Sequence, residues 1–388
     1  MSVQGTVEPG FEKVREVFER QFTQGQHIGA GVAVYLRDRL VVNLWGGTTE
    51  PEGGAPWRED TMTIMYSTTK GLTATCLHVL ADRGLVSYDD PVTKYWPEFG
   101  QNGKDKITVY HLLTHQAGCV EVPRELSVDD LTDWEKVIRA LEKLAPAWEP
   151  GAESGYHALT FGYLVGEVVR RVDGRSLGTF MREEITEPLG ISKLYIGVPE
   201  SEEPHFAKVY DRSELTPEQE EMRKQFFEGD SLVGRAMGAH LNAGGRTLQD
   251  LLNSREGHAA EIPAVSGVGC ARDLARFYAA LANDGELDGV RIMSPDRVRT
   301  IGERQTFRPD KVIIMPVGWA LGYMTGGAPG WPQGPRTNSF GHPGLGGSVG
   351  FADPEIGMAF GFVPNALKSD LIGAGRATEL ADAARACL

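Results

Sequence analysis

Cysteine is scarce in this sequence. The 388 residues include four cysteines, Cys76, Cys119, Cys270 and Cys387, and these lie far apart along the chain. Wide spacing of this kind matches neither the close pairs that bind zinc nor the dense framework of a small disulfide-linked domain. We therefore expect reduced thiols, and the sequence predicts neither a metal site nor another cofactor.

Positive charge and long apolar stretches are also lacking. The chain has 39 Lys and Arg against 53 Asp and Glu, which gives a formal net charge of −14 at pH 7. This charge repels nucleic-acid phosphates and anionic membranes, so we expect neither as a partner. No apolar stretch approaches the roughly 20 residues that a membrane span needs. The first residues have neither a basic start nor an apolar run, which predicts no secretory signal and a cytoplasmic location.

Short runs rich in β-branched and aromatic residues occur near both ends of the chain and predict strands. The N-terminal pair flanks a short polar segment, as expected for a hairpin. The runs are 30–36, 40–45, 317–324, 348–351 and 358–363.

Apolar residues at helical spacing are found mainly in the middle of the chain. They mark 131–144, 159–172 and 271–283, with further helices at 11–22 and 378–386. We therefore predict an α+β fold, in which an antiparallel sheet formed from both chain ends and flanked by helices carries an inserted, mostly helical lobe. The predicted boundaries are 1–84 and 300–388 for the sheet domain and 85–299 for the helical domain, with the active site at the junction.

The stretch from Tyr66 to Gly71 combines a nucleophile with a base. The apolar residues that follow recur every three or four positions, which predicts a helix over 69–83 with one buried face. Side chains at i and i+3 share a helix face, so Lys70 can reach the Ser67 hydroxyl and accept its proton. The free N–H groups at a helix start favour negative charge developing beside Ser67. A serine cap followed by a solvated lysine would give the same letters, so the motif alone does not identify a nucleophile.

Three further strings follow in a characteristic order. They are Leu112-Leu113-Thr114-His115, Trp148-Glu149-Pro150-Gly151 leading to Tyr156, and Gly341-His342-Pro343-Gly344. Together with Ser67-Thr68-Thr69-Lys70, they make residues 29–364 resemble the serine β-lactamase and penicillin-binding-protein-like superfamily. The resemblance is strongest to its class C-like branch and to the family VIII carboxylesterases, and it implies a β-lactamase-like fold.

The resemblance implies roles for three side chains. Ser67 matches the nucleophile that becomes acylated, and Lys70 matches the partner that keeps this serine deprotonated. Tyr156 matches the tyrosine that serves as, or assists, the general base. The set is chemically coherent, because a neighbouring ammonium is needed to lower the pKa of a serine or tyrosine hydroxyl.

The segment from His342 to Gly344 falls where the superfamily has a Lys-Thr-Gly strand beside the active site. The match implies that His342 and Gly344 contact the substrate, and that the backbone N–H groups of Ser67 and Leu345 form the oxyanion hole. The glycines of this segment permit a close approach of the backbone. An ordinary edge-strand histidine is the alternative for His342.

Two positions depart from the β-lactamase pattern. Residue 158 is Ala, where the pattern has the Asn that contacts an amide substrate, and residue 342 is His instead of Lys. Both changes favour hydrolysis of a small-molecule carboxylic ester, although the Trp-Gly-Gly string of many family VIII esterases is absent here. A β-lactamase, D-amino-acid peptidase or acyltransferase of the same superfamily is one alternative. A non-catalytic binding or assembly protein is another, and the retention of Ser67, Lys70 and Tyr156 together argues against it.

Two other patterns suggest chemistry that we do not expect. Residues 346–350 match the Gly-x-Ser-x-Gly nucleophile elbow around Ser348. That elbow needs a helix after the serine and a later histidine, whereas strands are predicted here and no histidine follows His342. His111 and His115 have a metal-like spacing but lack the adjacent Glu and a third ligand, so we predict a structural helix for them.

Overall fold

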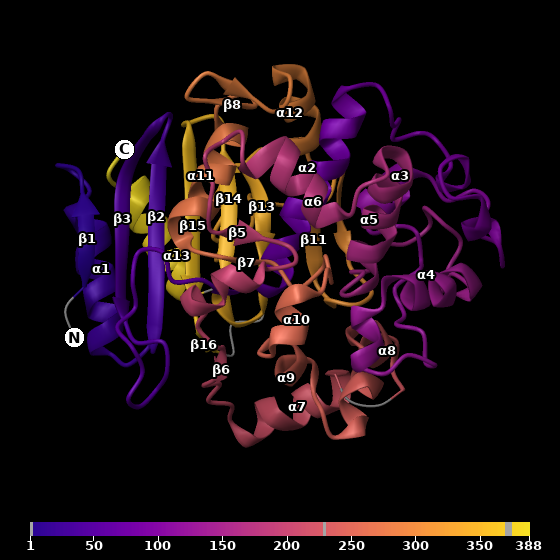
Figure 1. Ribbon diagram of the computed structural model, residues 1–388, viewed down its shortest axis with the longest axis horizontal. Coiled ribbons are helices and arrows are strands. Elements are labelled where there is room, and N and C mark those ends of the chain that lie inside the picture. Colours follow the sequence, from indigo (N-terminus) through magenta and orange to yellow (C-terminus); the bar gives the residue numbers. More distant parts are fainter. Residues whose placement is uncertain (1–2, 228–229, 369–374) are drawn as a thin grey trace.

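A nine-stranded sheet forms the framework of the computed structural model, which describes residues 3–227, 230–368 and 375–388. The strand order is β1-β3-β2-β15-β14-β13-β12-β11-β10, and every neighbouring pair is antiparallel. The two ends of the chain meet where β2 (Gly29–Leu36) pairs with β15 (Met358–Pro364). This topology, visible in Figure 1, confirms the predicted α+β fold class.

Seven other strands complete this sheet. They are β1 (Gln4–Val7), β3 (Arg39–Gly47), β10 (Thr306–Pro309), β11 (Pro316–Trp319), β12 (Met324–Thr325), β13 (Phe340–Pro343) and β14 (Val349–Asp353). The predicted hairpin corresponds to β2 and β3. The single run predicted at 317–324 is wrong, because the backbone turns back between β11 and β12 and Ala320 N–H donates to Tyr323 O. The residues of this turn are buried, so their apolar character resembles that of a strand.

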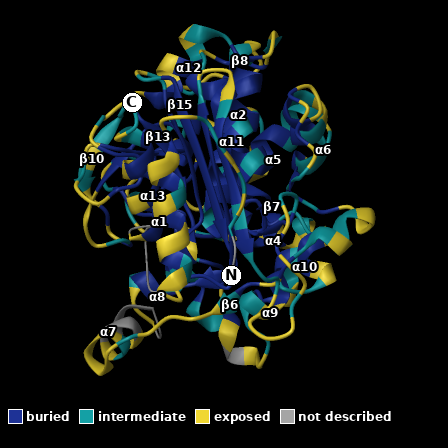
Figure 2. Cartoon of the chain, turned by 90° about the vertical axis from the view of Figure 1, so that its left-hand side faces the viewer, coloured by how far each residue is buried: buried dark blue, intermediate teal, exposed yellow. Residues whose placement is uncertain are grey.

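Helices cover both faces of the sheet. Figure 2 shows α1 (Glu12–Thr23) and α13 (Arg376–Arg385) on one side, and α11 (Ala271–Ala282) and α2 (Thr69–Asp82) on the other. Every residue of β15 is consequently buried. Helix α11 packs very close to this strand, since a Cβ at Gly361 would lie 2.5 Å from Ala271 O.

The other helices lie mostly to the right of β11 or below the sheet in Figure 1. They are α3 (Val109–Leu113), α4 (Trp134–Lys143), α5 (Thr160–Asp173), α6 (Leu177–Met181), α7 (Pro217–Phe227), α8 (Leu232–Met237), α9 (Leu248–Leu252), α10 (Arg255–Ala259) and α12 (Pro295–Gly302). None of the helices in the described ranges is both long and apolar enough to cross a membrane. The division into domains at 84 and 300 remains a prediction, and α11 from the middle of the chain packs on the sheet.

Helix α2 differs from its prediction in one respect. Its position is correct, but all residues from Thr69 to Ala81 are buried, not one face alone. The reason is that α2 is covered by α5 and α6 as well as by the sheet. A helix enclosed on all sides holds its side chains in fixed positions, which suits the start of α2 to an active site.

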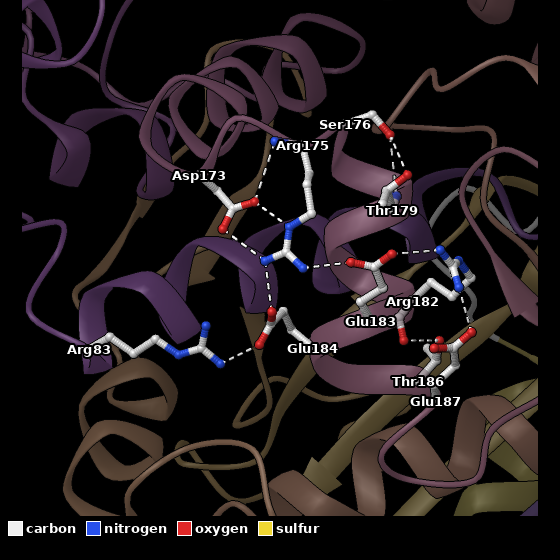
Figure 3. Close-up of polar contacts among 10 residues, drawn as sticks. All are labelled: Arg83, Asp173, Arg175, Ser176, Thr179, Arg182, Glu183, Glu184, Thr186 and Glu187. Carbon is white, nitrogen blue, oxygen red and sulfur yellow. Dashed lines mark hydrogen bonds and ion pairs between the residues drawn. The ribbon is translucent and has the colours of Figure 1, made fainter.

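An ion-pair network fixes the short segment after α6. Figure 3 shows Arg175 between three carboxylates, those of Asp173, Glu183 and Glu184. Glu184 also pairs with Arg83, just after the C-terminal end of α2. The network therefore links α2 to the segment 173–187, which includes a π-helical turn at 182–186.

Candidate active site

Ser67 lies in a tight turn that leads directly into α2. Residues Tyr66–Thr68 form a 3-10 turn, so Ser67 precedes the α-helix that was predicted to hold it at its start. Tyr66 has a φ of 46°, a left-handed conformation that large residues seldom adopt. The turn is held on both sides by Gly267, whose carbonyl accepts from Met65 N–H at 2.8 Å and whose N–H donates to Thr69 Oγ1 at 2.8 Å.

Lys70 is completely buried beside Ser67. Its Nζ lies 3.0 Å from Ser67 Oγ, 2.8 Å from Ala158 O and 3.0 Å from Ala264 O. No carboxylate is among these partners, and burial lowers the pKa of Lys70 well below its usual value. The environment therefore favours a neutral amine, which can accept a proton.

Tyr156 approaches Ser67 from the loop between α4 and α5. Its hydroxyl donates a hydrogen bond to Ser67 Oγ at 2.6 Å, and its ring centre lies 4.8 Å from Lys70 Nζ. Burial raises the pKa of Tyr156, so the phenol keeps its proton. The structure thus brings together the three side chains that were predicted to act together, because Lys70 and Tyr156 both contact the hydroxyl oxygen of Ser67.

Aromatic side chains pack around the Tyr156 ring. Trp319 of β11 stacks on it with 5.8 Å between ring centres and an angle of 11°, and His115 lies 5.3 Å away. The helix predicted to carry both His111 and His115 is only partly correct. Helix α3 ends at Leu113, and His115 has a φ of 57°. This turn places His115, for which a structural helix was predicted, against the ring of Tyr156.

His342 lies in β13, where it forms part of the wall of the site. Its ring stacks on Tyr156 at 5.9 Å, and only 1% of its surface is exposed. Its Nδ1 bonds to Pro343 O at 2.7 Å, while Nε2 has no partner within the described residues. Burial lowers the pKa of His342 to about 3, so the imidazole is neutral.

The turn after β13 lies against the Ser67 turn. Gly344 N–H donates to Ser348 O at 2.7 Å, and Gly347 N–H donates to Gly344 O at 3.1 Å, which closes the turn. A Cβ at Gly344 would lie 2.2 Å from Met65 O, so this approach requires glycine. Among the backbone hydrogen bonds that join turns and loops in the described chain, none uses the N–H of Ser67 or Leu345, so both groups can donate to an oxyanion.

Arg376 binds the turn after β13 through a backbone carbonyl. Its buried guanidinium donates to Gly346 O at 2.6 Å and to Ala366 O at 2.9 Å. It also donates to Gln26 O at 2.8 Å. The turn is therefore fixed to both ends of the chain through one side chain of α13.

Ser348 has a different role from Ser67. Its Oγ donates to Met65 O at 2.7 Å and lies 3.1 Å from Thr68 Oγ1. It is buried, and the strand β14 follows it, as predicted, where a nucleophile elbow would have a helix. Ser348 thus connects the two turns of the site.

Several residues at the site were missed in the sequence. The carbonyl of Ala264 contacts Lys70, and the side chains of Asp310 and Trp319 contact Tyr156. Ala264 contacts Lys70 through its backbone carbonyl, which every residue type has, so its identity in the sequence gives no signal. Asp310 and Trp319 lie in no motif, and β11 reaches Tyr156 only through the pairing of distant strands.

Comparison with known proteins gives consistent matches over the whole chain. A family model described as Beta-lactamase matches residues 14–385. Esterase/beta-lactamase LipL of Mycobacterium tuberculosis (strain ATCC 25618 / H37Rv) is 38% identical over 378 residues, which are 95% of this chain and 84% of that protein.

Two solved structures match equally well. A family VIII carboxylesterase has a TM-score of 0.89 and 37% identity, with 100% of both chains covered. A penicillin-binding protein homologue from Caulobacter crescentus has a TM-score of 0.90 and 37% identity, also over 100% of both chains. The resemblance predicted from the motifs is confirmed, and the chain is an enzyme of the beta-lactamase family.

Proposed function

We propose that this enzyme hydrolyses carboxylic esters of small molecules through an acyl-enzyme on Ser67. The observation that carries the proposal is the convergence of a buried amine and a buried phenol on one hydroxyl oxygen, at 3.0 and 2.6 Å. A nucleophile in hydrogen-bond contact with its base is the arrangement that covalent catalysis requires. The names of LipL and of the family VIII carboxylesterase support an ester as substrate.

The contacts of Lys70 suggest how the proton moves. A neutral amine has two N–H groups, and the carbonyls of Ala158 and Ala264 can accept both. The lone pair of Nζ then faces Ser67, which donates its hydroxyl proton to it. Tyr156 meanwhile donates to Ser67 Oγ, so each hydrogen bond of the trio has one donor and one acceptor.

The reaction then follows in two steps. Ser67 Oγ attacks the ester carbonyl as its proton passes to Lys70, and the N–H groups of Ser67 and Leu345 stabilise the oxyanion. The C–O bond to the alcohol breaks, and the departing alkoxide takes a proton from Tyr156, which Lys70 restores. In the second step, water attacks the acyl carbon as its proton passes to Lys70. The bond to Ser67 Oγ breaks, the acid is released, and Ser67 takes a proton from Tyr156, which Lys70 restores.

Two features favour an ester over a β-lactam or a peptide. Residue 158 contributes its carbonyl to Lys70 but has no side-chain amide for a substrate amide. His342 is neutral, so it supplies no fixed positive charge for a substrate carboxylate. β-Lactam hydrolysis is a second candidate, supported by the name esterase/beta-lactamase of the relative LipL.

Hydrolysis kinetics test this proposal. We expect kcat/KM for p-nitrophenyl acetate to exceed that for a cephalosporin by at least about a hundredfold, and Ser67→Ala to abolish both activities. Ser348→Ala is the matched control, because it removes a neighbouring buried hydroxyl and is expected to keep most of the activity. A higher kcat/KM for the cephalosporin, or full ester hydrolysis by Ser67→Ala, would contradict the proposal.

We also propose that the enzyme works in the cytoplasm. All four cysteines are free thiols, and Cys76, Cys119 and Cys270 are buried, as is usual in a reducing compartment. Cell fractionation with detection of the native protein tests this, and recovery outside the cytoplasm would contradict it.

A further inference from the structure

Asp310 is a buried carboxylate close to the site, in the connection between β10 and β11. Only 2% of its surface is exposed. Its Oδ1 accepts three backbone N–H groups, those of Tyr156, Val312 and Ile313, each at 2.9 Å. One oxygen of Asp310 thus joins its own loop to the backbone of the proposed catalytic tyrosine.

The second oxygen of Asp310 reaches Tyr156 by another route. Oδ2 lies 3.3 Å from the indole Nε1 of Trp319, which donates to it. The same indole stacks on the Tyr156 phenol ring at an angle of 11°. Asp310 therefore holds Tyr156 at two points, directly at the main chain and through Trp319 at the ring.

The charge of Asp310 is not neutralised by an ion pair. Across the described ranges, Asp310 forms no ion pair, and Lys311 of the same loop pairs with Glu153 instead. Burying a carboxylate without a cation is costly, and four N–H donors are needed to hold it. A neutral residue could form the turn of this loop without the free-energy cost of burying a charge. The presence of a buried carboxylate therefore points to a role at the neighbouring site.

We propose that Asp310 is a positioning residue that holds the Tyr156 hydroxyl on Ser67 Oγ. The inference rests on the proposed function, because it concerns the same trio of side chains. The 2.6 Å contact between Tyr156 and Ser67 depends on the ring position, and small displacements of a reacting group cost large factors in rate. Trp319 transmits the restraint from the carboxylate to the ring.

Asp310→Asn is the variant that tests this role. Its Oδ1 still accepts the three backbone N–H groups, but its amide N–H₂ replaces Oδ2 and faces the Trp319 N–H, so two donors oppose each other. We expect kcat for p-nitrophenyl acetate to fall at least about tenfold while KM changes less than about threefold. In a Trp319→Phe background the opposed donor is absent, so the same substitution is expected to cost less than about threefold in kcat.

Asp273→Asn is the matched control. Asp273 is also 2% exposed. Its carboxylate accepts the N–H groups of Ser192 and Lys193 at 2.9 and 2.7 Å and, unlike Asp310, pairs with an arginine, Arg272, away from the trio. We expect this variant to lower the melting temperature and leave kcat unchanged. A loss of kcat in Asp273→Asn equal to that in Asp310→Asn would show a general effect of disturbing the fold and would overturn the inference.

The remaining outcomes separate this inference from the proposed function. A kcat within twofold of wild type in Asp310→Asn, or equal losses with and without Trp319, would overturn the positioning role while Ser67 remained the nucleophile. If Asp310→Asn does not fold, the kcat of Trp319→Phe is the test instead. An unchanged kcat in that variant would overturn the positioning role of Asp310. Labelling of wild-type Ser67 by a fluorophosphonate is measured in parallel, and its failure would instead reject the proposed function.

Discussion

At the scale of single residues, the proposed chemistry depends on Ser67, Lys70 and Tyr156, and burial sets the environment of the last two. Lys70 has no carboxylate partner and a pKa lowered by burial, whereas burial raises the pKa of Tyr156. The two shifts have one cause, because burial always disfavours the charged form. Burial thus favours the neutral form of both groups, an amine able to accept a proton and a phenol able to donate one.

Lys70→Arg tests the proton acceptor. The guanidinium can donate to the same carbonyls, but its pKa remains above about 12, so it cannot accept a proton. We expect kcat/KM to fall at least about a thousandfold, with the protein still folded. In the wild type, kcat/KM should rise with pH as Lys70 loses its proton. A Lys70→Arg variant that kept a tenth of the activity would exclude Lys70 as the base.

Tyr156→Phe tests the proton donor. The phenol is needed most when the leaving alcohol is a poor one, because an alkoxide must be protonated and p-nitrophenolate need not be. We therefore expect the loss in kcat to be at least about tenfold greater for an ethyl ester than for the p-nitrophenyl ester of the same acid. Equal losses with the two esters would show that Tyr156 does not protonate the leaving group.

At the scale of elements, most residues of the site lie on turns and loops that contact one another. The Ser67 turn, the Tyr156 loop and the turn after β13 converge although they are far apart in the chain. The motif residues could be predicted, as could the helices α1, α2, α4, α5, α11 and α13, because local spacing and turn residues determine them. Asp310, Trp319 and the orientation of His115 could not, because they depend on strand pairing and on a left-handed backbone that no local pattern specifies.

Gly344→Ala tests the contact between two of these turns. A Cβ at this position would lie 2.2 Å from Met65 O and 2.3 Å from Ser348 Oγ, so the turns must separate. We expect both a lower melting temperature and a loss of kcat of at least about tenfold. Gly244→Ala is the control, since a Cβ added there would meet nothing within 4 Å. Normal activity in Gly344→Ala would mean that activity does not depend on this close contact between the turn after β13 and the Ser67 turn.

At the scale of the whole molecule, buried histidines make stability depend on pH. Burial lowers the pKa of His78, His157 and His342 to about 3 in each case. In the unfolded chain these groups have a pKa of about 6.5. Between about pH 6.5 and pH 3 the unfolded chain therefore binds protons that the folded chain does not, and the free energy of unfolding falls as the pH decreases.

Urea unfolding at pH 7 and pH 5 measures this effect. Each histidine whose folded pKa lies well below 5 is expected to cost about 2 kcal/mol of unfolding free energy over this interval. His78→Gln removes one such group. The free energy of unfolding of this variant should therefore decrease between pH 7 and pH 5 by about 2 kcal/mol less than that of the wild type. An identical loss in the variant and the wild type would show that His78 is not neutral in the folded protein.

The central claim is that Ser67 becomes acylated, and intact mass spectrometry tests it most directly. The enzyme is mixed briefly with a short p-nitrophenyl ester, a cephalosporin or a fluorophosphonate, and the modified peptide is then mapped. We predict a single adduct on Ser67, with turnover of the ester. An adduct on Ser348, or no adduct with any of the three reagents, would contradict the account.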